Sequence, residues 1–172
     1  MSTPTSLPPL SPEQAAHSAR LVDRIRDEID AHQGWISFER FMELALYEPG
    51  LGYYSAGASK FGEAGDFVTA PEISPLFSRC LANQCIEVFG RIGPADILEL
   101  GAGSGVMAAD ILTELQATNQ LPRTYFILEV SADLRERQRE RLSRLAPEVI
   151  ERVQWLDVWP TGFRGVVLAN EV

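Results

Sequence analysis

The sequence predicts an α/β fold built on a parallel sheet. An apolar run at residues 96–100 is short enough for one buried strand, and a helical pattern starts at Val106, directly after three glycines. Three further segments, at residues 123–130, 152–156 and 165–169, have the length and apolar character of strands. Strands that alternate with helices in this way are typical of a Rossmann-like sheet.

The loop after the first strand is a candidate ligand site. It reads Glu99-Leu-Gly-Ala-Gly-Ser-Gly105, so its glycines alternate at Gly101, Gly103 and Gly105. A backbone without Cβ atoms can lie against a ligand, and the next helix points its free N–H groups at the same place. A dinucleotide loop would need a small residue at Val106, and Glu99 would repel its pyrophosphate. The pattern E-x-G-x-G-x-G instead resembles the cofactor loop of S-adenosylmethionine (SAM) methyltransferases; a glycine-rich turn without a ligand is the alternative.

Two acidic residues at strand ends are further candidates for cofactor contacts. Glu129 ends the second strand, about twenty residues beyond the glycines, where a carboxylate accepts hydrogen bonds from both ribose hydroxyls. The alternative for Glu129 is a solvated surface residue. Asp157 follows the third strand, where its side chain could meet the adenine amino group. Trp155 could stack on the adenine ring, but a core position is favoured.

Composition limits the classes of partner. The chain has 172 residues, a formal net charge of −9 and a single lysine, Lys60, which argues against a nucleic-acid surface and favours a basic partner or substrate. Its apolar runs are too short to span a bilayer. Cys80 and Cys85 are expected to be separate thiols in a reducing compartment, and His17 and His32 lack ligand-spaced partners, so no metal site is visible. These features, with an N-terminus that lacks the basic residues of a targeting signal, predict a cytoplasmic protein.

The chain is expected to have three parts. Residues 1–10 are rich in Ser, Thr and Pro and are predicted to be disordered. Residues 11–92 are expected to form an added N-terminal helical lobe, and residues 93–172 the first four strands of a Rossmann-like domain. Residues 55–72 within the lobe show little periodicity, which is typical of a functional loop or of a flexible connector. A charged helix at residues 131–145 is expected to be a solvated surface.

One segment carries a more specific resemblance. Residues 65–72 read Gly-Asp-Phe-Val-Thr-Ala-Pro-Glu, and with the glycine loop and the terminal Asn170-Glu171 pair they resemble the MidA family of SAM-dependent methyltransferases over about residues 20–172. The resemblance implies that Gly65, Asp66 and Phe67 help to enclose the cofactor, so that the loop acts as a lid. Family members continue well beyond this length, so the chain is expected to be the N-terminal half of the fold and to be inactive alone.

The resemblance also suggests a reaction. A mitochondrial branch of the family methylates protein arginine during complex I assembly, which implies a protein substrate and raises a respiratory-complex subunit as a candidate. Asn170 and Glu171 are the candidate catalytic residues, because carboxylates and carbonyls at a strand end can orient a guanidinium group. The alternative for Glu171 is that it has no role. Two other functions stay open: a SAM-binding assembly protein without turnover, and a small-molecule N- or O-methyltransferase. The oligomeric state is also open.

Overall fold

The structure is a computed structural model that describes residues 10–56 and 68–171. The chain divides into two compact units, Met1–Ala56 and Gly57–Val172. The first unit contains α1 (Pro12–Ala31) and α2 (Phe38–Tyr47). Ser11 begins α1 with a capping box to Gln14. Glu28 of α1 accepts hydrogen bonds from Arg24 and from Arg40 of α2, and these bonds, that of Arg40 foremost, lower the pKa of Glu28 to about 2.

The second unit is a parallel four-stranded sheet with helices packed against it. Its strands are β1 (Asp96–Leu100), β2 (Tyr125–Leu128), β3 (Val153–Leu156) and β4 (Gly165–Ala169). Its helices are α3 (Ala70–Ile73), α4 (Pro75–Ile92), α5 (Val106–Ala117), α6 (Ala132–Leu145) and the 3-10 turn η1 (Ile150–Arg152). The strand order is β3-β2-β1-β4, with every neighbouring pair parallel. The predicted Rossmann-like fold is therefore confirmed.

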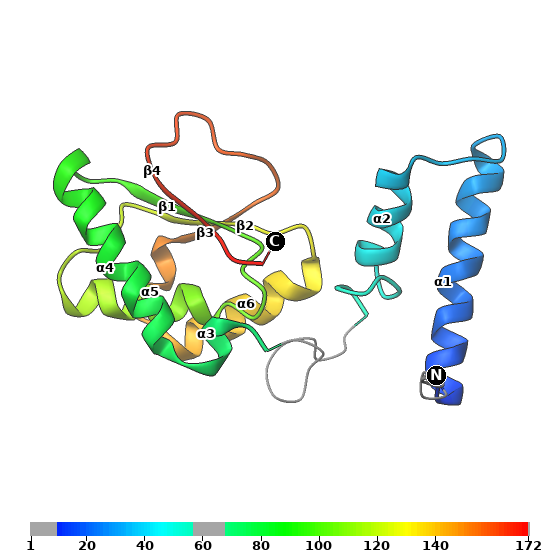
Figure 1. Cartoon of the computed structure of the whole chain (residues 1–172), viewed down its shortest axis with the longest axis horizontal. Helices are drawn as coiled ribbons and strands as arrows, with labels where there is room; N and C mark the ends of the chain where they lie inside the picture. Colours follow the sequence, from blue (N-terminus) through cyan, green and yellow to red (C-terminus); the bar gives the residue numbers. More distant parts are fainter. Residues whose placement is uncertain (1–9, 57–67, 172) are drawn as a thin grey trace, which may run out of the picture. The chain divides into compact units, whose positions relative to one another are not determined.

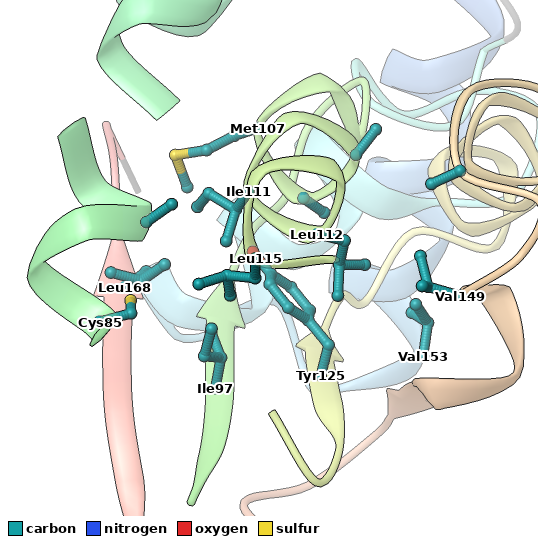
Figure 2. Packing of buried hydrophobic residues seen from close by; sticks show 14 of the residues in the cluster. Cys85, Ile97, Met107, Ile111, Leu112, Leu115, Tyr125, Val149, Val153 and Leu168 are labelled. Atoms are coloured by element: carbon teal, nitrogen blue, oxygen red, sulfur yellow. The ribbon is translucent and has the colours of Figure 1, made fainter. Parts of the chain in front are cut away.

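One face of the sheet carries the main hydrophobic core. Figure 1 shows α4, α5 and α6 on the same side of the sheet, and Figure 2 shows the side chains packed between α4, α5 and the strands. The strands contribute Ile97, Tyr125 and Ile127, all fully buried. Helix α5 has a stripe of apolar residues on the same core, Ile111, Leu112 and Leu115. Truncating such a leucine to alanine costs about 2–5 kcal/mol, so this packing fixes how the strand ends are presented.

The boundary between the units differs from the one expected from the sequence. The sequence placed α4 in a helical lobe over residues 11–92, whereas the structure divides the chain after Ala56. The reason is that Ala82, Cys85 and Phe89 recur at helical spacing on α4 and are buried in the same core as β1. Helix α4 is therefore a covering helix of the sheet. Among the helices that the structure describes, none has both the length and the apolar character needed to cross a membrane.

Candidate cofactor site

The four parallel strands end in one row. Leu100 of β1 pairs with Leu128 of β2 and with Ala169 of β4, and Leu128 pairs with Leu156 of β3. Each of the next residues along the chain therefore leaves the sheet at the same carboxyl edge: Gly101, Glu129, Asp157 and Asn170. Ligands of open parallel sheets bind at this edge. The register thus brings together four positions that the sequence had singled out separately.

The glycine loop has a backbone that only glycine adopts without strain. Its φ angles are 58° at Gly101, 53° at Gly103 and 79° at Gly105, all in the left-handed region. The N–H of Gly101 donates to the carbonyl of Leu128 at 3.0 Å, which ties the loop to β2. Helix α5 begins at Val106, so its first N–H groups point toward the strand ends. The loop and helix form a backbone surface suited to close approach by a ligand.

Hydrogen bonds from neighbouring residues hold the Glu129 side chain in place. The side chain is buried, and burial raises the pKa of its carboxyl. One carboxylate oxygen accepts the backbone N–H of Ser131 at 2.9 Å, and the other accepts the amide of Gln138 at 3.2 Å. A carboxylate oxygen can accept two hydrogen bonds, so each retains capacity for a hydroxyl. The geometry suits the predicted ribose contact, which stays a prediction.

Glu99 faces the core beneath the loop. It is 1% exposed, and its carboxylate accepts the Tyr125 hydroxyl at 2.7 Å. The pKa of Glu99 is raised to about 7, chiefly by burial; the Tyr125 hydrogen bond opposes the rise and the charge of Glu129 adds to it. Since one of its oxygens is bound to Tyr125, a direct contact with the amino group of a methionine tail is less favoured than an effect through the loop. The role of Glu99 in cofactor binding stays a prediction.

The end of β3 is joined to β2 by an arginine. Arg135 of α6 donates to the backbone carbonyls of Glu129 and Leu156, and its Nη2 lies 2.7 Å from Oδ1 of Asp157. The Asp157 side chain is 85% exposed, so its predicted contact with an adenine amino group is sterically open and stays untested. Trp155 packs against the core, as favoured from the sequence, and the Arg139 guanidinium lies 4.7 Å over its ring.

Of the five remaining residues predicted for the site, the structure describes two, Asn170 and Glu171. Asn170 is half-buried and Glu171 is exposed with a left-handed φ of 54°, so both lie at the carboxyl edge of the sheet. Gly65, Asp66 and Phe67 lie outside the described residues. Glu72, the last residue of the family-specific segment, does reach the loop: its carboxylate accepts the hydroxyl of Ser104.

Sequence reasoning missed two residues of the site, Arg135 and Gln138. Both lie on α6, which was expected to be a solvated surface because arginine and glutamate alternate along it. Leu134, Gln138 and Leu142 are nevertheless fully or almost fully buried at a spacing of four residues. A polar residue in the middle of an apolar stripe is the signal that could have identified Gln138.

The residues present fit SAM. Left-handed glycines leave backbone free of Cβ atoms, the buried Glu129 carboxylate lies at the end of the next strand, and a helix begins at the same edge. A sequence profile of the family described as "Putative S-adenosyl-L-methionine-dependent methyltransferase" matches residues 80–172, more than half of the chain. The chain belongs to this family, which confirms the family resemblance and the SAM cofactor predicted from the loop.

Individual relatives agree with the family. A Burkholderia thailandensis protein crystallised with S-adenosyl-homocysteine is 47% identical, with a TM-score of 0.84 over 97% of this chain and 44% of its own. The mitochondrial protein arginine methyltransferase NDUFAF7 of Danio rerio is 37% identical over 64% of this chain and 28% of its own length. The Drosophila melanogaster homolog is 31% identical over 81% and 33%. The chain thus spans about a third of the length of these curated relatives.

Proposed function

We propose that the complete protein transfers a methyl group from SAM to a nitrogen atom of a protein arginine. The observation that carries the proposal is the common row of strand ends, where the glycine loop lies between Glu129 and Asn170. Relatives named protein arginine methyltransferases support arginine as the acceptor. Because the chain covers about a third of those proteins, the proposal concerns the full-length protein.

The residues of this chain would bind SAM and orient the arginine side chain of the substrate. Bound SAM would supply an activated methyl group: an aligned arginine nitrogen takes the methyl group, the sulfur leaves as a neutral thioether, and the proton lost by the nitrogen passes to water or to a nearby carboxylate. The glycine loop and Glu129 would hold the nucleoside, as their backbone and carboxylate geometry allows. The amide oxygen of Asn170 and the carboxylate of Glu171 would accept guanidinium N–H groups and turn one nitrogen toward the methyl group.

The charge of the chain supports a basic substrate. Asp and Glu total 24 against 15 Lys and Arg, which gives the formal net charge of −9. A negative protein attracts arginine-rich segments over a distance set by the salt concentration. Methylation of basic peptides should therefore weaken as ionic strength rises. A small-molecule acceptor without positive charge would not show this dependence.

The test is methyl transfer by the full-length protein from methyl-labelled SAM to arginine peptides and to matched lysine peptides. We expect label on arginine. Gly103→Val should abolish binding of S-adenosylhomocysteine in calorimetry, because valine tolerates neither the φ of 53° nor close backbone approach. Gly162→Val is the control: Gly162 has a similar φ of 68° but lies in open space outside the site. Unchanged affinity of Gly103→Val would refute the site, whereas binding without any transfer would favour an assembly protein.

Two finer points complete the proposal. A respiratory-complex subunit is the substrate suggested by the family resemblance, and the names of the relatives describe those proteins as mitochondrial. A cytoplasmic location of this protein is proposed because its two cysteines, Cys80 and Cys85, are free thiols and suit a reducing compartment. Subcellular fractionation and identification of methylated proteins in cells with and without the gene would test both points.

A further inference from the structure

We infer that Gln138 is a positioning residue for the cofactor, which holds Glu129 and the glycine loop in one fixed arrangement. The inference rests on the proposed function, because the ligand concerned is SAM. Gln138 lies on α6 and is 0% exposed. Its side chain hydrogen-bonds both the loop and the acid at the end of β2.

Both polar atoms of the Gln138 side-chain amide form hydrogen bonds. Nε2 donates to the carbonyl of Gly103 at 3.0 Å and to a carboxylate oxygen of Glu129 at 3.2 Å. Oε1 accepts the indole N–H of Trp155 at 2.9 Å. A reversed amide would place an oxygen against two acceptors and an NH₂ group against a donor, so the chemistry of the partners fixes the orientation.

Close packing on the loop accompanies these bonds. A Cβ atom on Gly105 would lie 3.2 Å from Cγ and 3.3 Å from Cα of Gln138, so helix α6 lies tightly against the end of the loop. Leu134 and Leu142 flank Gln138 on the same buried stripe. A third leucine would fill such a stripe without the cost of burying an amide. The polar side chain is therefore better explained by what it binds than by the packing of α6.

Loss of the amide should leave two buried acceptors without this donor. Glu129 is 5% exposed, and without this donor its carboxylate would be free to rotate away from the proposed ribose contact. The Gln138 hydrogen bond also opposes the rise in the pKa of Glu129 that burial causes. Other groups that act on this carboxyl are the backbone N–H groups of Ser131 and Val130, the Arg135 guanidinium and the Glu99 carboxyl beneath the loop. Without Gln138, Glu129 should bind a proton at higher pH, which turns one of its two acceptor oxygens into a donor.

The experiment compares Gln138→Met with the parent in the full-length protein. Methionine keeps the length and approximate volume of glutamine and removes the hydrogen bonds. Calorimetry measures the affinity for S-adenosylhomocysteine and for its analogue without the ribose 2′-hydroxyl, from pH 5 to pH 8. We expect Gln138→Met to bind S-adenosylhomocysteine about tenfold more weakly and to discriminate less between the two ligands. As the pH is lowered, the affinity of the variant should begin to fall at a higher pH than the affinity of the parent. Gln84→Met, on the exposed surface of α4, is the matched control and should change none of these quantities.

The discrimination ratio separates positioning from a purely structural role. Simple loss of stability would weaken both ligands equally and leave the ratio unchanged. If Gln138→Met does not fold, Trp155→Phe takes its place, because it removes the indole donor to Gln138 while keeping an aromatic ring, and it should lower the ratio by less. The inference would be overturned, and the proposed function would stand, if the folded variant kept the parent's ratio of affinities for the two ligands and lost affinity at the same pH on acidification. A parent protein that binds no S-adenosylhomocysteine would overturn both.

Discussion

Glu99→Gln should remove the loss of stability that ionisation of the buried Glu99 carboxyl causes as pH rises. The Glu99 carboxyl is buried against Tyr125, and its pKa is about 7 in the folded protein against an ordinary value of 4.5. A raised pKa in the folded state means that folding favours the protonated form. The stabilisation is therefore fully present below pH 4.5 and is lost as pH rises through 7.

The magnitude follows from the difference between the two pKa values. Each unit of pKa corresponds to about 1.4 kcal/mol, so full ionisation of Glu99 costs about 3 kcal/mol of unfolding free energy, as an upper limit. Glutamine has a similar shape, can accept the Tyr125 hydroxyl and does not ionise. The variant should therefore exceed the parent in stability by an amount that grows by about 2 kcal/mol between pH 5 and pH 8.

The assay is urea unfolding of parent and variant at pH 5, 6, 7 and 8 without cofactor. Comparing the two proteins at each pH cancels the contributions of titrating groups that do not interact with Glu99, whereas Glu129 interacts with it. Glu87→Gln makes the same chemical change on the exposed surface of α4 and should give a difference that does not depend on pH. A flat difference for Glu99→Gln as well would refute the reasoning, because it would mean that the Glu99 carboxyl is not buried as described.

Three further predictions concern the glycine loop, the arginine that joins β2 to β3, and the edge strand β4. Gly105→Ala should lower the unfolding free energy by about 1–2 kcal/mol, because the φ of Gly105 is 79° and an added Cβ would press on Gln138 of α6. Gly162→Ala is the control and should lower the unfolding free energy by less, because a Cβ at Gly162 would lie in open space. Urea unfolding of both variants compares the two effects. Arg135→Met should cost about 1–3 kcal/mol by removing a largely buried charged donor, and Arg144→Met, on the exposed surface, is its control in the same assay. The 172-residue polypeptide should self-associate through β4, an edge strand of the sheet, and Val167→Lys should prevent this, since Val167 is 43% exposed; light scattering would decide, and a monomeric parent would contradict the prediction.

Features encoded in contiguous residues could be predicted closely. The strand at residues 96–100, the glycines after it and the helix from Val106 agree with the structure, because an apolar run, left-handed turn residues and helical periodicity follow one another along the chain. The fourth strand was predicted with its observed bounds, residues 165–169. The strand order is the one that a Rossmann-like methyltransferase, the fold class predicted from the sequence, is expected to have.

Features that depend on distant contacts could not be predicted in the same way. The charge pattern of α6 correctly indicated a solvated face but concealed the narrow stripe through Gln138, because a helix can be charged over most of its surface and still bury one line of residues. Helix α4 was placed in the wrong unit for a related reason. Its apolar residues predict that one face is buried, but nothing local identifies α5 and β4 as the surface that buries it.

Strand register connects the core to the site. Tyr125 and Ile127 of β2 face the buried core beside α5, and Leu128 pairs with Leu100, so Glu129 leaves the sheet next to Gly101. A slip of one residue would turn both core side chains to the other face of the sheet and carry Glu129 out of reach of α6. Such a slip would forfeit the burial of a tyrosine and an isoleucine, each worth about 2–3 kcal/mol. Apolar residues without any contact to the cofactor therefore determine where the candidate ribose acid stands, and substitutions that loosen them should weaken cofactor binding as well as stability.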